Sequence, residues 1–342
     1  MRVASGLGRL LAAALLMAGP LALAGCTEAS TVEAPPRPDA AGFTNPVYDS
    51  NFPDPMIIAD PAGGFWAVAT NGNGSNVQTL RSADLVSWEQ GPDALPELPD
   101  WTSAGKIWAP EVVAAGAGRY LLYYTTRGPD PAIQCVSVAV GTKPEGPYRD
   151  DSTRPLVCEK DQGGSIDAHP LLTADGQHYL YWKNDGNAVG VDTYISAAEL
   201  NADGTQLAGK PERLFKQDLP WEGSLVEGPF LWEDGGRFHL FYSANDYGSD
   251  AYAVGHAVAD QPLGPFTKSG DPVLATNDVA AGPGHCSLFA HNGRVWMVYH
   301  AWTPGEIGGS IPGRAMWLSE VTFAADGTVT VVPPTMDYPT RP

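Results

Sequence analysis

Positive charge is scarce in this 342-residue sequence, where 20 Lys and Arg residues stand against 39 Asp and Glu residues. The formal net charge is −19. An acidic chain repels phosphate backbones, so the composition argues against a nucleic acid as partner. The acids are spread along the chain without a block of like charge, which is typical of a solvated surface. We expect a monomer.

Long stretches with a helical repeat of apolar residues are also scarce, because 39 Gly and 31 Pro residues interrupt most windows. Aromatic residues are plentiful, with 10 Trp and 13 Tyr. Short strands joined by tight turns suit this composition, so the sequence predicts an all-β fold. The length allows one large domain or two small ones.

Only the N-terminus carries a long apolar run. Arg2 and Arg9 form a basic region before the apolar stretch 10–24, which is short for a membrane span. It ends in "LAGC" at residues 23–26, which resembles the bacterial lipobox, where cleavage leaves the cysteine as a lipid-modified N-terminus. The sequence therefore predicts a signal peptide over 1–25, a lipid on Cys26, a disordered tether over 26–42 and a domain over 43–342.

Two destinations follow from this N-terminus. The lipid would anchor the protein to the outer face of the bacterial cell membrane, and it would be the protein's only contact with the membrane. A plain secretory signal beside an unmodified cysteine would instead give a secreted protein.

Cysteine is rare, with four residues, and no CxxC or paired-histidine spacing suggests zinc. Removing Cys26 leaves an odd number in an oxidising compartment. Cys135 and Cys158 are the closer pair and flank one strand-turn unit, so we expect a disulfide between them and a free Cys286.

An internal repeat organises the rest of the chain. Five aromatic segments, "FWAVAT", "YLLYYT", "YLYW", "FHLFYS" and "VWMVYH", begin at residues 65, 120, 179, 238 and 295, so successive starts lie 55 to 59 residues apart. A polar residue in a short motif precedes each segment: Asp54 in "FPDP", Glu111 in "WAPEV", Asp167 in "IDAHP", Glu227 in "VEGPF" and His285 in "GPGHCSLF".

This period suits a four-stranded antiparallel blade, so five periods predict a five-bladed β-propeller around a central channel. A β-sandwich would not need such a repeat. The motif residues would open the innermost strands, and all five should then converge at one end of the channel.

Three carboxylates among these residues, Asp54, Asp167 and Glu227, point to chemistry. An acid in a turn is usually structural, but clustered carboxylates raise one another's pKa and cost stability unless they are used. Glycosidic cleavage needs one carboxylate as base on water and another as proton donor to the leaving oxygen. A third acid can hold the donor's pKa high and orient it.

These motifs together resemble glycoside hydrolase family 43, from about residue 45 to the C-terminus. The resemblance implies a five-bladed propeller that inverts configuration at the anomeric carbon. By matching position, it implies that Asp54 is the general base, Glu227 the general acid and Asp167 the residue that modulates the acid's pKa. The family pattern usually has Pro after the modulating Asp, where this chain has Ala168. For an inverting pair we expect carboxyls roughly 6.5–9.5 Å apart.

The resemblance implies three further roles. His285 matches a histidine that holds a central calcium or sodium ion, often through waters, and Arg314 matches an arginine that reaches the active site. We expect no organic cofactor. Trp108, next to a channel-facing motif, is our candidate for the platform that stacks against a sugar ring. The alternatives are a hydrogen-bonded core histidine, a surface arginine and a core tryptophan. Glu111 matches no catalytic role, and we interpret it as structural.

The family's substrates include α-L-arabinofuranosides, β-D-xylosides and galactofuranosides. The chain ends soon after the fifth repeat, without room for the C-terminal sandwich typical of many xylosidases in the family. This favours a plant or microbial polysaccharide or oligosaccharide that contains arabinose. A β-xylosidase or galactofuranosidase is the alternative, and endo and exo action both remain open. A non-catalytic, glycan-binding surface lipoprotein is the alternative from another class, but a lectin has no need of three convergent acids.

Overall fold

The computed structural model describes residues 42–116, 118–128, 130, 133–173 and 175–342. The predicted signal peptide, Cys26 and all but the last residue of the predicted tether lie outside these residues. Within them, no helix is long and apolar enough to cross a membrane.

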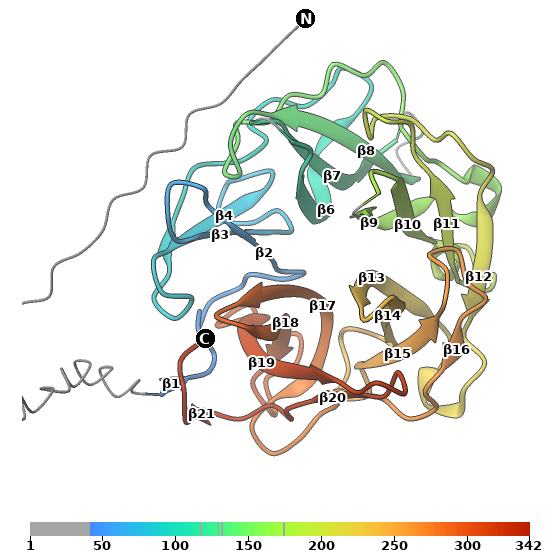
Figure 1. Ribbon diagram of the computed structural model, residues 1–342. Coiled ribbons are helices and arrows are strands. Elements are labelled where there is room, and N and C mark those ends of the chain that lie inside the picture. The colour runs from blue at the N-terminus through green and yellow to red at the C-terminus, as the bar shows by residue number, and fades with distance from the viewer. Residues whose placement is uncertain (1–41, 117, 129, 131–132, 174) are drawn as a thin grey trace, which may run out of the picture. The chain divides into compact units, whose positions relative to one another are not determined.

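Five antiparallel sheets stand around a common centre, which confirms the predicted five-bladed β-propeller (Figure 1). The first three blades are β2 (Met56–Ala59), β3 (Phe65–Ala69), β4 (Gln78–Ser82) and β5 (Glu89–Gln90); β6 (Ser103–Ala114), β7 (Tyr120–Arg127) and β8 (Gln134–Gly141); β9 (Ser165–Leu172), β10 (His178–Asn184), β11 (Tyr194–Glu199) and β12 (Glu212–Lys216). The last two are β13 (Val226–Asp234), β14 (Arg237–Ala244), β15 (Ala253–Ala259) and β16 (Thr267–Lys268); β17 (Ala281–His291), β18 (Arg294–Trp302), β19 (Ala315–Phe323) and β20 (Val329–Val331).

Helix is confined, in the described part of the chain, to three short 3₁₀ turns. They are η1 (Lys160–Gln162), η2 (Gly186–Ala188) and η3 (Pro220–Glu222). This agrees with the scarcity of helical periodicity in the sequence.

The second blade departs from four regular strands. Its outer edge is formed by isolated bridges, in which Arg149 pairs with Val140 and Val157 pairs with Val136. Pro147 and Pro155 lie in or beside this segment, and proline has no N–H to donate to a ladder. A continuous fourth strand is therefore replaced by two separate contacts.

The ends of the domain meet in one small sheet. The strand β1 (Phe43–Thr44) pairs with β21 (Asp337–Tyr338), and the rings of Phe43 and Tyr338 stack with centroids 4.9 Å apart. Figure 1 shows this pair beside the fifth blade. The pairing ties the first residues of the propeller to its last.

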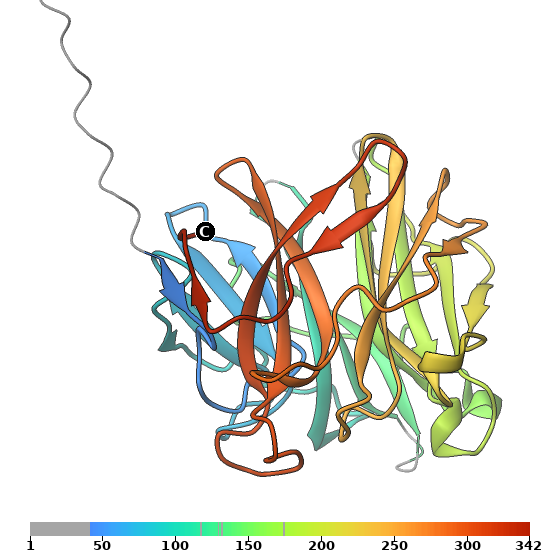
Figure 2. The same ribbon diagram turned by 90° about the horizontal axis from the view of Figure 1, so that it is seen from below.

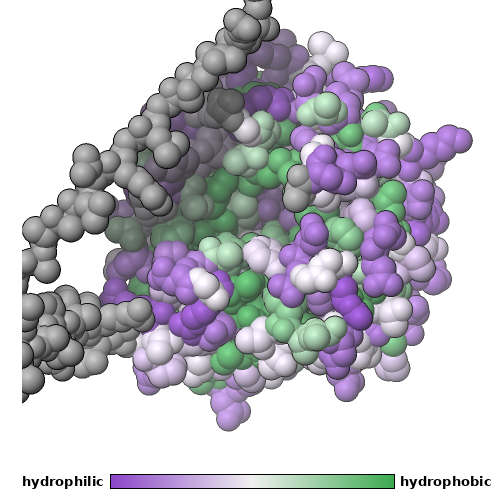
Figure 3. Space-filling model, in the orientation of Figure 1, coloured by the Kyte–Doolittle hydropathy of each residue, from purple (hydrophilic) through white to green (hydrophobic). Residues whose placement is uncertain are grey.

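The core lies between the blades, which stand side by side in the view of Figure 2. Five clusters of buried hydrophobic residues occupy the five junctions between neighbouring blades. The repeated aromatic segments form the second strand of each blade, and their large side chains fill the junctions: Tyr124, Trp182, Tyr242, Trp296 and Tyr299 are all buried. Each such side chain stabilises the fold by about 1.5–3 kcal/mol. Hydrophilic residues predominate at the periphery of the face shown in Figure 3.

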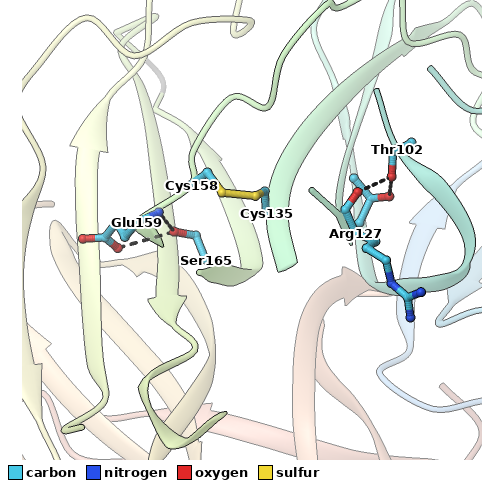
Figure 4. The surroundings of a disulfide bond; sticks show 7 residues. Thr102, Arg127, Cys135, Cys158, Glu159 and Ser165 are labelled. Carbon is cyan, nitrogen blue, oxygen red and sulfur yellow. Dashed lines mark hydrogen bonds between the residues drawn. A yellow bond between two sulfur atoms is a disulfide. The ribbon is translucent and has the colours of Figure 1, made fainter. Parts of the chain in front are cut away.

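A disulfide joins Cys135 of β8 to Cys158, the pairing that the sequence favours (Figure 4). The two Cα atoms lie 4.7 Å apart, within the usual range. The bond links the second blade to the segment that leads into the third. Cys286 is buried and carries a free thiol.

Candidate active site

A pocket of about 620 Å³ opens among the innermost strands, and all five blades contribute to its lining. Its walls are formed by Asp54, Thr70, Lys106, Trp108, Ile166, Asp167, Lys183, Asp185, Asn187, Ala188, Ser224, Leu225, Glu227, Asp246, Tyr247, His285 and Arg314. Six of these are residues that the sequence predicts for the site: Asp54, Trp108, Asp167, Glu227, His285 and Arg314.

A repeated backbone feature places these side chains. One residue near the start of each blade has a positive φ, namely Asp54 (58°), Ala109 (44°), Asp167 (59°), Gly228 (55°) and His285 (48°). In the last four blades the ladder between the first two strands is irregular at this point. Bulges re-aim side chains, and backbone strain of this kind concentrates at functional sites. The turn thus directs a side chain from each strand toward the pocket.

A second-strand side chain anchors most of these turns. Thr70 accepts the N–H of Ala109 (2.8 Å), Thr125 that of Asp167 (3.0 Å) and Ser243 that of His285 (2.7 Å). His300 accepts the N–H of Asp54 through Nδ1 (3.1 Å). Each of these four acceptors is the last residue of the aromatic segment of its repeat. Four of the five blades therefore fix the turn of the next blade.

Asp54 sits in a positively charged corner of the pocket. Its Oδ1 atom lies 3.0 Å from a guanidinium nitrogen of Arg314 and 3.4 Å from Nδ1 of His285. Its Oδ2 atom accepts the hydroxyl of Thr70. Burial alone would raise the pKa of Asp54, but the charges of Arg314 and His285 outweigh it and hold the pKa well below its ordinary value. Asp54 is therefore ionised at neutral pH.

His300 supports Asp54 as a neutral ring. Its Nδ1 atom accepts a backbone N–H, so that atom carries a lone pair. Burial lowers the pKa of His300 to about 4, and the charge of Arg314 adds to this effect. The same nitrogen lies 3.3 Å from Oδ1 of Asp54, and this is therefore a close contact between two acceptors. His300 stabilises the backbone of Asp54 through the hydrogen bond from its N–H.

Glu227 is held by a donor on each oxygen. Lys183 donates to Oε2 (3.0 Å) and the hydroxyl of Tyr252 donates to Oε1 (2.8 Å). Burial would raise the pKa of Glu227, but the charge and hydrogen bond of Lys183 outweigh burial and lower it. Asp167 differs, since burial and the charge of Glu227 together raise its pKa to about 6 despite the nearby His285. The pair therefore shares a proton that Asp167 holds more tightly in the free site.

Asp167 is also bonded to the blade that carries the acid. Its Oδ2 atom accepts the backbone N–H of Gly228 (3.0 Å), the residue after Glu227. Asp167 and Glu227 thus come from neighbouring blades but share one backbone connection.

The residues around His285 do not fit a cation held by protein ligands. Burial lowers the pKa of His285, but the carboxylates of Asp54, Asp167 and Glu227 raise it above its ordinary value. In the described part of the chain, no group of three or more His, Cys, Asp or Glu residues could hold a metal. A calcium or sodium ion held through waters stays a prediction, and no step proposed below uses one.

Two aromatic rings line the pocket, each with a cation beside it. The ammonium of Lys106 lies 5.1 Å from the centre of the Trp108 ring, so a cation covers part of the predicted sugar platform. Arg314 lies 4.7 Å from the ring of Tyr247, whose side chain is half exposed. Tyr247 is a second candidate platform, and nothing in the repeat pattern singled it out.

Glu111 does not join the other motif residues, so the prediction that all five converge on the pocket is wrong for this one. It is absent from the pocket lining, and its Oε2 atom lies 3.8 Å from Nδ1 of His169. The positive-φ position of the second blade belongs to Ala109, two residues earlier. Glu111 therefore points to a buried contact, in agreement with the structural role expected for it.

Sequence reasoning missed Lys183 and Tyr252. Lys183 directly follows the quoted segment "YLYW", at the position where the other repeats have Thr, Thr, Ser and His. Aligning the five repeats one residue further would have shown this exception. Tyr252 has no such signal, because it lies in the connection before β15.

Comparison with known proteins gives a consistent result. The family model described as glycosyl hydrolases family 43 matches residues 43–329. The β-D-galactofuranosidase xynD of Aspergillus niger is 30% identical over 273 residues, which cover 75% of each chain. The extracellular endo-α-(1→5)-L-arabinanase 2 of Bacillus subtilis is 23% identical over 82% of this chain and 71% of its own. The crystal structure of a thermostable family-43 glycoside hydrolase superposes with a TM-score of 0.78 at 29% identity, covering 86% of this chain and 97% of that one.

Proposed function

The chain belongs to the glycosyl hydrolases of family 43, and we propose that it is an inverting glycosidase in which Asp54 activates water and Glu227 protonates the leaving oxygen. Membership of a family of glycosidases favours catalysis over the alternative of a binding-only propeller. The finer assignments rest on the charge distribution within the pocket.

One observation carries the proposal, namely that the pocket separates its carboxyl groups into two electrostatic environments. Arg314 and His285 hold Asp54 in the ionised form. Asp167, with a pKa raised by burial to about 6, keeps a proton within the Asp167–Glu227 pair at mildly acidic pH. A site that drives the pKa values of its titratable groups apart can supply a base and an acid together.

Asp54 takes a proton from water while the water oxygen bonds to the anomeric carbon. The bond from that carbon to the leaving oxygen breaks on the opposite face, and Glu227 transfers its proton to that oxygen. The proton that Asp54 gains is released to solvent and the Asp167–Glu227 pair takes one up from solvent, which completes the cycle, while Asp167 fixes the backbone beside Glu227 through Gly228.

For the substrate, we propose a furanoside, first of all an α-L-arabinofuranoside within a polysaccharide or oligosaccharide. The names of the two sequence relatives support this choice, one being an arabinanase and the other a galactofuranosidase. The rings of α-L-arabinofuranose and β-D-galactofuranose have the same configuration and differ in the exocyclic carbon chain. One pocket can therefore fit both, and the galactofuranoside is the second candidate.

The screen that tests the substrate compares aryl α-L-arabinofuranoside, aryl β-D-galactofuranoside, aryl β-D-xyloside and linear arabinan. We expect the arabinofuranoside or arabinan to be hydrolysed fastest. Preference for the xyloside would contradict the furanoside proposal and leave the family assignment intact.

Two variants and one product analysis test the mechanism. Asp54→Ala should abolish turnover of every substrate, because water then lacks its base. Glu227→Ala should lose far less activity on substrates with acidic leaving groups, which depart without a proton. Proton NMR early in the reaction should show the inverted anomer first. Retained configuration, or Asp54→Ala at the wild-type rate, would overturn the mechanism.

We propose further that the protein is exported and that a lipid on Cys26 anchors it. The lipobox-like "LAGC" supports this, as does the word extracellular in the name of the Bacillus subtilis relative. Cys26→Ala should release the protein into the medium. A variant that stays cell-bound, together with native protein that takes up no labelled fatty acid, would refute the anchor.

A further inference from the structure

The third blade breaks the anchoring pattern of the other four. At the last position of the aromatic segment the other blades carry Thr70, Thr125, Ser243 and His300, each of which accepts a backbone N–H of the next blade. The third blade carries Lys183 instead. An ammonium group has three donors and no acceptor, so Lys183 cannot anchor a backbone N–H.

Two hydrogen bonds that the other blades do not have compensate for the missing acceptor. The N–H of Gly228, which has lost its second-strand acceptor, donates to Oδ2 of Asp167. The ammonium of Lys183 donates to Oε2 of Glu227 and lies 3.8 Å from Oδ1 of Asp185. Because the third blade carries Lys183, Asp167 gains the N–H of Gly228 as a partner and Glu227 gains the ammonium of Lys183.

Lys183 places a charged ammonium in the buried interior, where desolvation of the charge is unfavourable. Its side chain is 1% exposed, and an unpaired ammonium there would be strongly unfavourable. Burial lowers the pKa of Lys183, but the charges of Glu227, Asp167 and Asp185 outweigh burial and raise it, so the group stays protonated. A Thr or Ser, as in three other blades, would avoid this cost. The presence of Lys183 at this position therefore calls for a role in the pocket.

We propose that Lys183 is a positioning residue for the reaction, which together with Tyr252 aims the Glu227 carboxyl and supplies the positive charge that balances Glu227 when it gives up its proton. The inference rests on the proposed function, since it assigns Glu227 as the acid. The titratable or charged groups that face Glu227 and Lys183 are Asp167, Asp185, Tyr252 and His285, and Asp54 acts in turn on Asp167 and Tyr252.

The charge acts on the proton transfer itself. As the proton leaves Glu227 for the glycosidic oxygen, a carboxylate forms 3.0 Å from the ammonium. An opposite charge at this distance stabilises the ionised product and makes Glu227 a stronger acid. Tyr252 contributes a neutral hydrogen bond to the other oxygen, which fixes the direction in which the carboxyl faces.

The pH profile of kcat/KM for an aryl α-L-arabinofuranoside with a poor leaving group tests this role. Activity falls at high pH as the Asp167–Glu227 pair loses its proton. Lys183→Met removes the cation and should raise the apparent pKa of the pair, whichever member holds the proton. The basic limb should therefore move to higher pH by about one unit or more. Lys183→Arg keeps the charge and should leave the limb at its wild-type position even where the rate falls.

Lys268→Met is the matched control, because Lys268 forms a second buried Lys–Glu pair, with Glu222, outside the pocket. It should leave the basic limb unchanged. A Lys183→Met limb at the wild-type position would overturn the proposal. Should neither Lys183 variant fold, carboxyl ¹³C NMR of the wild-type protein, assigned with Glu227→Gln, decides the matter: Glu227 must titrate below Asp167.

Failure of the proposed function gives a different result. If Glu227 is not the acid, Glu227→Ala loses activity equally on all leaving groups. If only the role of Lys183 is wrong, the leaving-group dependence of Glu227→Ala persists while the Lys183→Met limb does not move.

Discussion

Two buried Lys–Glu pairs, Lys183–Glu227 and Lys268–Glu222, have glutamates that lie close together in the sequence but serve different roles. In the first pair the nitrogen lies 3.0 Å from the carboxylate, and in the second 2.7 Å. The glutamate side chain of the first is 12% exposed and lines the pocket, whereas that of Glu222 is 0% exposed. The chemical groups are the same, so the difference lies in their surroundings.

Glu222 is saturated with donors from the protein. Its oxygens accept from Lys268, from the hydroxyl of Tyr242 (2.6 Å) and from the backbone N–H groups of Asp218 (2.7 Å) and Leu219 (2.9 Å). The last bond joins Glu222, at the end of η3, to the residue that precedes this turn. Glu222 therefore ties the connection before β13 to the outer strands of its blade, and it has no free lone pair to offer a ligand.

Glu227 has two donors and an open side. One of its partners, Lys183, also faces Asp185, while the pocket leaves space for a substrate. A pair that is complete within the protein stabilises the fold, and a pair left incomplete at a pocket can exchange a proton. The distinction teaches that burial of an ion pair alone does not mark a functional site, and that access to a ligand does.

The sharpest test of this distinction replaces each glutamate by glutamine. Glu227→Gln should lower kcat/KM on substrates with poor leaving groups by about 10²–10⁴-fold, the usual contribution of an acid catalyst, with little change in thermal stability. Glu222→Gln should leave kcat/KM near the wild-type value and lower the unfolding temperature. Initial rates and thermal unfolding of both variants give the comparison, and a catalytic defect in folded Glu222→Gln would erase it.

The lysines provide a test through stability. Lys268→Met leaves a fully buried carboxylate without its cation, which should reduce the free energy of unfolding by about 3–5 kcal/mol. Lys183→Met should lose less, because water in the pocket can reach Glu227. Urea denaturation at neutral pH measures both values. Equal losses would mean that the pocket does not relieve the Glu227 charge.

The sequence predicted the fold because the repeat is carried by large residues with a uniform task. Aromatic segments 55 to 59 residues apart each fill a junction between blades, so the same physical demand recurs five times. Asp54, Asp167 and His285 were found for the same reason, since each occupies the positive-φ turn at the start of its blade.

The site was predicted less completely where residues break the repeat. In the sequence pattern, Glu111 is equivalent to the other motif residues, because the distance from motif to aromatic segment varies by a few residues between repeats. This variation concealed that Ala109, and not Glu111, occupies the positive-φ position of the second blade. Lys183 lies one residue beyond the segment used to define the repeat. Tyr252, Tyr247 and Lys106 come from connections or strand ends whose course depends on the packing of whole blades, which local sequence patterns do not specify.

The disulfide between Cys135 and Cys158 is a covalent contact outside the pocket, and like Glu222 it should stabilise the fold without affecting catalysis. Removing it with Cys135→Ala and Cys158→Ala should reduce the free energy of unfolding by about 2–4 kcal/mol, because the unfolded chain gains the freedom of a loop between two residues 23 apart. Activity of the folded variant should be unchanged, since neither residue lines the pocket. Denaturant unfolding and kcat/KM at a temperature well below the transition check both parts. A loss of activity without loss of stability would connect the disulfide to the site.

The smallest expected effect concerns Asp167 and carries the opposite sign. Burial raises the pKa of Asp167 to about 6, above the ordinary 3.8. The folded protein therefore binds this proton more tightly than the unfolded chain, and the resulting stability is complete below the ordinary pKa and is lost as the pH rises through about 6. Asp167→Asn cannot ionise, and asparagine tolerates the positive φ and can still accept the N–H of Gly228. The variant should thus be more stable than the wild type by about 1–3 kcal/mol at pH 7, with the difference shrinking toward pH 4, while its activity falls. Urea denaturation at both pH values measures this. A variant that is less stable than wild type at pH 7 would show that the Asp167 carboxylate supports the fold, as Glu222 does, and would remove the contrast between the pocket and the residues outside it.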